Sequence, residues 1–159
     1  MRTLFASICL FVAMGAQSAG VTLDAEIAAP ILQFMDSFNK GDANGAEAAH
    51  MKQGVVIIDE VPPHQWQGDG AFAAWLRDLT KHDEAGGVTD GNVKLGDAIR
   101  QVVSGDHAYV VMAAEYTFKR KGVPMKAVAQ MTFALVKGAG GWRISGWTYS
   151  GAEGVPVKP

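Results

Sequence analysis

The sequence predicts an α+β protein in which three N-terminal helices pack on a strongly curved, mainly antiparallel sheet. Two features carry this prediction: apolar residues recur at helical spacing in the first half of the chain, and they alternate with polar residues in the second half. With 159 residues, 14 basic and 16 acidic side chains, and 48% hydrophobic residues, the chain has the composition of one globular domain. The near-neutral charge balance argues against a nucleic-acid partner.

The first twenty residues have the three-part form of a secretory signal. Arg2 precedes an apolar stretch at residues 4–14, and small residues follow it as far as Ala19. We expect cleavage after Ser18, which removes residues 1–18, with Ala19 or Gly20 as alternative sites. A secreted, periplasmic protein would result; a flexible N-terminal tail is the other interpretation. Eleven apolar residues are too few to span a membrane, so no stable membrane insertion is expected after cleavage.

Two helices are expected before residue 51. Asp24 can cap the first, which ends at Gly41 because glycine adopts the left-handed conformation that stops a helix without strain. Pro30 falls inside this helix, so the helix either starts there or is kinked in its first turn. Asp42 then caps a short second helix that runs to His50. The first helix has one apolar stripe, formed by Ile27, Ile31, Phe34 and Phe38.

A strand and a third helix follow. The aliphatic run Val55–Ile58 predicts a buried strand that ends near Asp59. A proline-rich loop at residues 60–66 leads to the third helix, for which Asp69 is the expected cap. That helix ends at Gly86-Gly87, and its apolar stripe consists of Phe72, Trp75, Leu76 and Leu79.

The remainder of the chain predicts a sheet. Apolar residues alternate with polar ones, which indicates antiparallel strands covered on one face. Tyr109, Val111 and Ala113 would form a small apolar patch on the outer face, and from it we predict a homodimer. Residues 151–159 are expected to be disordered. Glycine-containing turns divide the preceding segment into four predicted strands, at residues 93–103, 107–118, 125–136 and 142–150.

Two short segments accompany this order of elements. Asn39-Lys40-Gly41-Asp42 closes the first helix, and Gly141-Trp142-Arg143-Ile144 opens the last strand. In this the chain resembles the nuclear-transport-factor-2-like superfamily, and within it the SnoaL-like branch. The resemblance implies a conical, cystatin-like domain over residues 24–150, whose bent sheet wraps the first helix around a pocket. Superfamily members include isomerases, cyclases, dehydratases, binding domains and dimerisation modules, so the fold alone does not determine the function.

Asp59 is the first candidate catalytic residue. Four aliphatic residues precede it, so its carboxylate is expected at a pocket wall, where burial raises the pKa toward that of a useful base. Asp59 lies nine residues before Gly68, a spacing similar to that of the general-base aspartate in the ketosteroid isomerases of this superfamily. The alternative is that Asp59 caps the following loop or pairs with a basic side chain.

The comparison with ketosteroid isomerases also implies what is missing. The positions of their oxyanion-binding tyrosine and second aspartate fall on Phe34 and Met131, whose side chains donate no hydrogen bond. Losing such donors lowers a rate by orders of magnitude, so steroid isomerisation is not expected. His64, in the loop after Asp59, is the candidate acid–base partner; the alternative is a solvated loop histidine.

A ligand pocket is predicted beside Asp59. Three of the predicted lining residues have another interpretation. Tyr116 could be a structural tyrosine at the end of the sheet, and Trp147 and Tyr149 could be core residues. No metal and no cofactor is expected, because the four histidines show no metal-ligand spacing and the only cysteine, Cys9, lies in the predicted signal. The residues expected to line the pocket are Phe34, Trp66, Met112, Tyr116, Met131, Trp147 and Tyr149.

Three functions are compatible with the sequence. The first is a domain that binds a small apolar molecule near Asp59 without chemistry. The second is a lyase, isomerase or cyclase that uses Asp59 as general base on a small hydrophobic substrate. The third is a dimerisation or protein-interaction module with a pocket plugged by Phe34, Met112, Met131 and Trp147.

Overall fold

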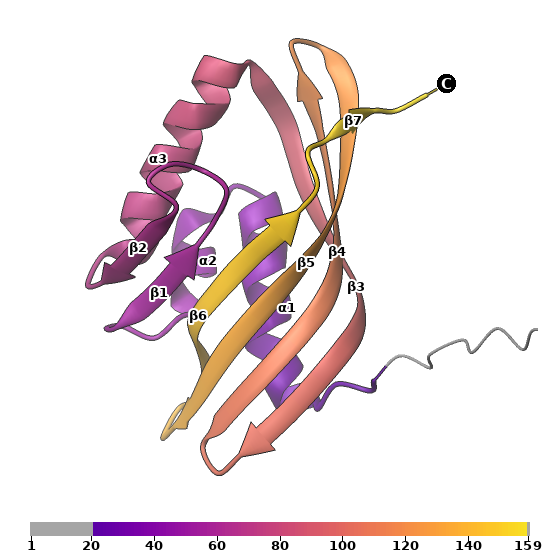
Figure 1. The fold of residues 1–159 in the computed structure, drawn as a ribbon. Helices are drawn as coiled ribbons and strands as arrows, with labels where there is room; N and C mark the ends of the chain where they lie inside the picture. Colours follow the sequence, from indigo (N-terminus) through magenta and orange to yellow (C-terminus); the bar gives the residue numbers. More distant parts are fainter. Residues whose placement is uncertain (1–20, 159) are drawn as a thin grey trace, which may run out of the picture.

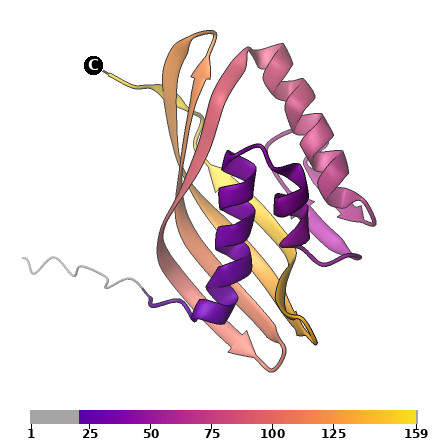
Figure 2. The same ribbon diagram turned by 180° about the vertical axis from the view of Figure 1, so that it is seen from behind.

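A computed structural model describes residues 21–158, so the predicted signal at residues 1–18 lies outside the described residues. The helices of this range lie on one side of a sheet that curves around α1 (Figure 1, Figure 2). The predicted α+β fold, helices on a curved and mainly antiparallel sheet, is confirmed. The elements are α1 (Ala25–Asn39), α2 (Ala43–Ala48), β1 (Val55–Ile58), β2 (Gln65–Gly68), α3 (Ala71–Gly86), β3 (Val88–Ser104), β4 (His107–Arg120), β5 (Val123–Gly138), β6 (Gly141–Gly151) and β7 (Val155–Pro156).

The strands form a sheet in the order β2-β1-β6-β5-β4-β3, and β7 pairs with β5 outside this path. Within the described residues β1 and β6 form the one parallel pair, and the other pairs are antiparallel. The register of β3 on β4 shifts between Leu95 and Ala98 and again between Ala98 and Arg100. Such bulges bend and twist a strand, which gives the sheet the curvature that encloses the helices.

One expected helix cap is confirmed and another is not. The α1 helix begins at Ala25, where the Asp24 carboxylate accepts the backbone N–H of Glu26 at 2.9 Å, so Pro30 lies inside the helix rather than at its start. Asp69 was expected to cap α3, but Gly70 occupies the cap position with φ 74° and no side-chain hydrogen bond. The turn from β2 into α3 requires this left-handed residue, and glycine adopts that conformation without strain.

Two segments around β1 also differ. Val55 and Ile57 are buried, but Val56 and Ile58 are 37% and 48% exposed, so β1 is buried on one face only. The expected burial therefore holds for the inner face alone, because among residues 21–158 no helix covers the outer face of the sheet (Figure 1). Part of the expected loop at residues 60–66 is instead β2, which pairs antiparallel with β1.

Residues 152–158, part of the tail expected to be disordered, lie against the sheet. Val155 and Pro156 pair with β5, and the backbone N–H of Val157 donates to the Pro124 oxygen at 2.9 Å. Gly154 lies directly against the ring of Phe118, since an added Cβ there would be 2.7 Å from the ring. These contacts hold the segment beside the end of β4 (Figure 1).

The outer face of the sheet carries the patch from which a homodimer was predicted. Tyr109 is exposed and Ala113 is half-buried, but Val111 is buried by its neighbours. The exposed part of the patch is therefore smaller than expected, and the homodimer stays a prediction. Among the helices of residues 21–158, none has both the length and the apolar character that crossing a membrane requires.

Candidate functional site

A cavity of about 370 Å³ is lined by the C-terminal half of α3, the start of β3, the end of β4 and the segment after β6. This volume falls within the range of small-molecule pockets. Its aromatic wall consists of Phe34, Phe38, Trp75, Tyr116, Phe118, Trp147 and Tyr149. Its polar and ionisable lining residues are Asp59, Glu60, Thr80, His82, Asp83, Arg120 and Glu153.

The inner end of the cavity is an aromatic cluster centred on Phe34. The ring of Phe34 lies 5.4 Å from that of Trp147 and 6.4 Å from that of Trp75, measured between centroids. Trp75 and Trp147 meet edge to face at 4.9 Å, a favourable arrangement for aromatic pairs. Helix α1 thus contributes Phe34, α3 contributes Trp75 and β6 contributes Trp147 to one rigid apolar surface.

Asp59 follows β1 directly and its carboxylate lies in the cavity wall. The indole N–H of Trp75 donates to Oδ2 at 2.6 Å, and the backbone N–H of Glu60 donates to Oδ1 at 2.6 Å. Burial raises the pKa of Asp59 above its ordinary value, and the two hydrogen bonds oppose this by favouring the ionised form. Asp59 is therefore an oriented hydrogen-bond acceptor in a largely apolar wall.

Two further ionisable groups face the cavity from the C-terminal part of α3. Burial raises the pKa of Asp83; the charge of Asp59 adds to this rise, while His82 opposes it. His82 also lines the cavity, and a positive charge on its ring lowers the pKa of both carboxyl groups. The polar side of the cavity is thus a coupled group of two carboxyls and one imidazole.

Two tyrosines complete the polar side. Burial raises the pKa of Tyr149 to about 12 and also raises that of Tyr116, so both phenols are neutral hydrogen-bonding groups at neutral pH. The Tyr116 hydroxyl lies against Gly91, where an added Cβ would come within 2.9 Å of it. Gly91 therefore makes room for this phenol at the cavity wall.

A buried histidine forms a hydrogen bond with one tryptophan of the aromatic cluster. His50 is 4% exposed; its Nδ1 lies 2.9 Å from the Ala46 oxygen, and its Nε2 accepts the indole N–H of Trp147 at 3.0 Å. This arrangement requires a neutral ring protonated at Nδ1. Burial accordingly lowers the pKa of His50 to about 4. His50 thus fixes the orientation of Trp147.

The model of a known family, the SnoaL-like domain, matches residues 27–153 of the chain. The chain belongs to the SnoaL-like domain family. The match runs from α1 to Glu153, so it includes every lining residue of the cavity except Gly154. The expected membership in the SnoaL-like branch of the nuclear-transport-factor-2-like superfamily is confirmed.

Solved structures agree with this assignment at the level of the fold. A ketosteroid isomerase-like protein from Erwinia carotovora atroseptica has 24% identity and a TM-score of 0.62, with 85% of this chain and 96% of that chain covered. A nuclear transport factor 2-like superfamily protein from Salmonella enterica serovar Typhimurium has 20% identity and a TM-score of 0.65, with 84% and 90% covered. An NTF2-like protein with a cystatin-like fold from Novosphingobium aromaticivorans has 19% identity and a TM-score of 0.62, with 78% of each chain covered. No functionally curated protein matches the sequence.

The cavity of this SnoaL-like domain contains most of the residues expected to form its site. Asp59 lies in the cavity wall. Met112 was expected to line the pocket, but it packs in the hydrophobic core and does not border the cavity. Met112 is on the inner face of β4 but nearer the opposite end of the strand from Tyr116. The other expected lining residues that do border the cavity are Phe34, Tyr116, Met131, Trp147 and Tyr149.

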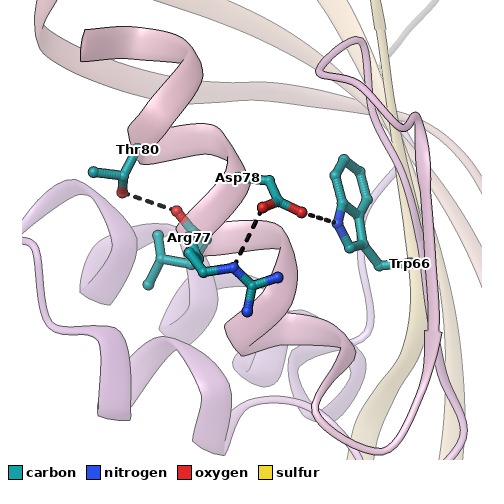
Figure 3. A network of polar contacts seen from close by, with 5 residues as sticks. Trp66, Arg77, Asp78 and Thr80 are labelled. Carbon is teal, nitrogen blue, oxygen red and sulfur yellow. Dashed lines mark hydrogen bonds and ion pairs between the residues drawn. The ribbon is translucent and has the colours of Figure 1, made fainter.

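Trp66 was expected in the pocket but packs elsewhere in the SnoaL-like domain. Its indole N–H donates to Oδ2 of Asp78 at 3.0 Å, and Arg77 contacts the other oxygen of the same carboxylate at 3.3 Å (Figure 3). Because Trp66 lies on β2, which pairs back on β1, its ring meets the side of α3 rather than the cavity. Trp66 joins β2 to α3 and is not a cavity residue.

His64 contacts the backbone of Asp59 and does not line the cavity. Its side chain is exposed and is not part of the cavity wall, and its Nδ1 lies 3.3 Å from the backbone oxygen of Asp59. The backbone at His64 turns through a positive φ of 75° to enter β2, which directs the ring away from the cavity. The histidine that borders the cavity is His82.

Two groups of cavity residues escaped the sequence analysis. Leu79 had been recognised as part of the apolar stripe of α3, and Asp83 lies one helical turn further on the same face. Continuing the stripe by four residues would have placed Asp83 in the site. Glu153 and Gly154 border the cavity from the segment expected to be disordered, and no sequence pattern indicated this.

Proposed function

We propose that this SnoaL-like domain binds a small, largely apolar molecule that presents a polar group to Asp59. The observation that carries the proposal is a cavity of about 370 Å³ with an aromatic wall and the Asp59 carboxylate within it. The alternative of a plugged interaction module is not favoured, because Phe34, Met131 and Trp147 border open space rather than filling it. The sequence of residues 1–18 suggests export, and the periplasm is the proposed setting.

Filling the cavity is expected to abolish binding. Ala127 lines the cavity from β5, so Ala127→Phe would place a ring in the space proposed for the ligand. We expect this variant to weaken the binding of a bicyclic aromatic alcohol such as 2-naphthol at least tenfold, measured by fluorescence titration. Val128→Phe is the matched control, because it adds the same ring to the exposed outer face of the same strand. Equal affinity for folded Ala127→Phe and wild type would contradict the proposal.

A second candidate function is proton transfer by Asp59. A carboxylate with a raised pKa in an apolar wall is a stronger base than one in water, and Tyr116 and Tyr149 offer neutral hydroxyl donors on the same side of the cavity. These phenols could replace the donors that Phe34 and Met131 do not supply. One of the similar structures, the protein from Erwinia carotovora atroseptica, is described as ketosteroid isomerase-like, and isomerisation of this kind proceeds by proton transfer.

Proton transfer can be tested without knowing the substrate. In deuterium oxide, Asp59 would remove a proton from the α-carbon of a bound cyclic ketone such as 2-tetralone, and the resulting enolate would take up a deuteron. We expect wild-type protein to accelerate this exchange, followed by NMR, and Asp59→Asn to reduce the acceleration at least a hundredfold. Asp106→Asn, at an exposed turn, is the control. Binding of the ketone without accelerated exchange would leave the binding function alone.

A further inference from the structure

The wall of the cavity is strongly biased toward negative charge. The carboxylates of Asp59, Glu60, Asp83 and Glu153 line it, and Arg120 is the one lysine or arginine among the described lining residues. Arg120 is already paired with Glu153, at 3.4 Å between Nη1 and Oε1. None of the ion pairs formed by residues 21–158 includes Asp59, Glu60 or Asp83.

The aromatic lining also favours a positively charged ligand. Aromatic ring faces attract cations, and they favour weakly hydrated organic cations that can leave water at low cost. The chain itself shows this chemistry at the cavity wall, where the Arg120 guanidinium lies 5.4 Å from the centroid of the Phe118 ring. The same guanidinium contacts the Glu153 carboxylate, so one cation is held between an aromatic face and an acid.

We infer that the cavity selects a ligand that carries a positive charge, an ammonium or quaternary ammonium group attached to an apolar body. This inference rests on the proposed binding function and names the chemical class of its ligand. The apolar body would pack on the ring cluster around Phe34, and the charged group would face Asp59 and Asp83.

The electrostatics of the cavity wall agree with this choice. Burial raises the pKa of Asp59, Glu60 and Asp83, and the charge of Asp59 raises the pKa of both other groups further. A cation among these groups would stabilise their ionised forms. An anionic ligand would instead meet three carboxylates, and the basic groups of the wall are Arg120, which is paired with Glu153, and the imidazole of His82.

Three probes of the same size separate the effect of charge from that of shape. Phenyltrimethylammonium, tert-butylbenzene and benzenesulfonate each join a phenyl ring to a tetrahedral group, but they carry positive, zero and negative charge. We expect wild-type protein at pH 8 and low ionic strength to bind the cation at least tenfold more tightly than the neutral hydrocarbon, and the anion most weakly. The dissociation constants are measured by NMR titration.

Two variants test whether Asp59 and Asp83 are the carboxylates that attract the cation. Asp59→Asn and Asp83→Asn preserve side-chain shape, and each is expected to reduce the preference for the cation at least threefold. Asp106→Asn removes a carboxylate outside the cavity and is expected to change nothing. Because the comparison of the three probes uses wild-type protein, it stays decisive even where a variant fails to fold.

The outcomes are distinct. Tighter binding of the neutral probe or of the anion, or equal binding of all three, overturns the inference and leaves the proposed binding function intact. The inference is also overturned if Asp59→Asn and Asp83→Asn both fold and both retain the full preference for the cation. Groups other than these two carboxylates would then attract it. Failure of all three probes to bind overturns the proposed function and the inference together.

Discussion

Phe34→Ala is expected to lower the free energy of unfolding by about 3–5 kcal/mol, the usual cost of truncating a fully buried phenylalanine. Phe34 is 1% exposed and its ring contacts those of Phe38, Phe72, Trp75 and Trp147. The loss combines removed apolar burial with a new void that large, interlocked rings cannot collapse to fill. Urea unfolding followed by tryptophan fluorescence measures the change.

Leu32→Ala is the matched control for this variant. Leu32 lies on the same helix but is 54% exposed, so its truncation is expected to change the free energy of unfolding by no more than about 0.5 kcal/mol. The Phe34→Ala protein should also have a larger cavity, because Phe34 is part of its wall. A loss of less than about 1 kcal/mol for Phe34→Ala would contradict the central role of this ring in the cluster.

The position of Asp59 was predictable because two signals agree on it, the aliphatic run that precedes it and its spacing of nine residues to Gly68. The aliphatic run predicts β1, and a carboxylate that directly follows such a strand lies at the end of the strand, beside the core. The stripes of α1 and α3 likewise identify Phe34 and Trp75 as inward-facing residues, since helical periodicity reports which face is buried. Local patterns therefore suffice for residues whose elements are long and regular.

The parts that were not predictable depend on contacts distant in sequence. The direction of the Trp66 ring is decided by the pairing of β2 with β1, which no local pattern reveals. Glu153 borders the cavity only because a two-residue strand pairs with β5, and so short a strand has no periodicity to detect. His50 is another such case, because its role depends on Trp147, 97 residues away.

Below neutral pH, His50 is expected to make folding strongly pH-dependent. Its pKa falls from the ordinary 6.5 to about 4 in the folded protein, so between these values the unfolded chain binds a proton that the folded chain does not. The free energy of unfolding therefore falls by about 1.4 kcal/mol for each unit of decreasing pH in this window, about 3 kcal/mol in all. A protonated ring could no longer accept the Trp147 indole N–H.

The carboxyl groups of the cavity act in the opposite direction. The folded-state pKa values of Asp59 and Asp83 are raised, so just above their ordinary value of 3.8 the folded protein binds protons more readily and gains stability as the pH falls. This gain opposes the loss caused by His50, so the contribution of the histidine is measured by comparing wild type with a variant that lacks only the imidazole.

His50→Gln isolates this contribution, because the glutamine oxygen can accept the Trp147 indole N–H but does not titrate. Urea unfolding at pH 7 and pH 5 should show that wild type loses about 2 kcal/mol more than the variant over this interval. His107→Gln, which replaces a histidine that is 67% exposed, leaves the Trp147 contact in place and should behave as wild type does. Equal losses in wild type and His50→Gln would mean that His50 is not held neutral in the fold. The orientation of Trp147 in the cavity wall would then need another cause, since the hydrogen bond depends on the neutral ring.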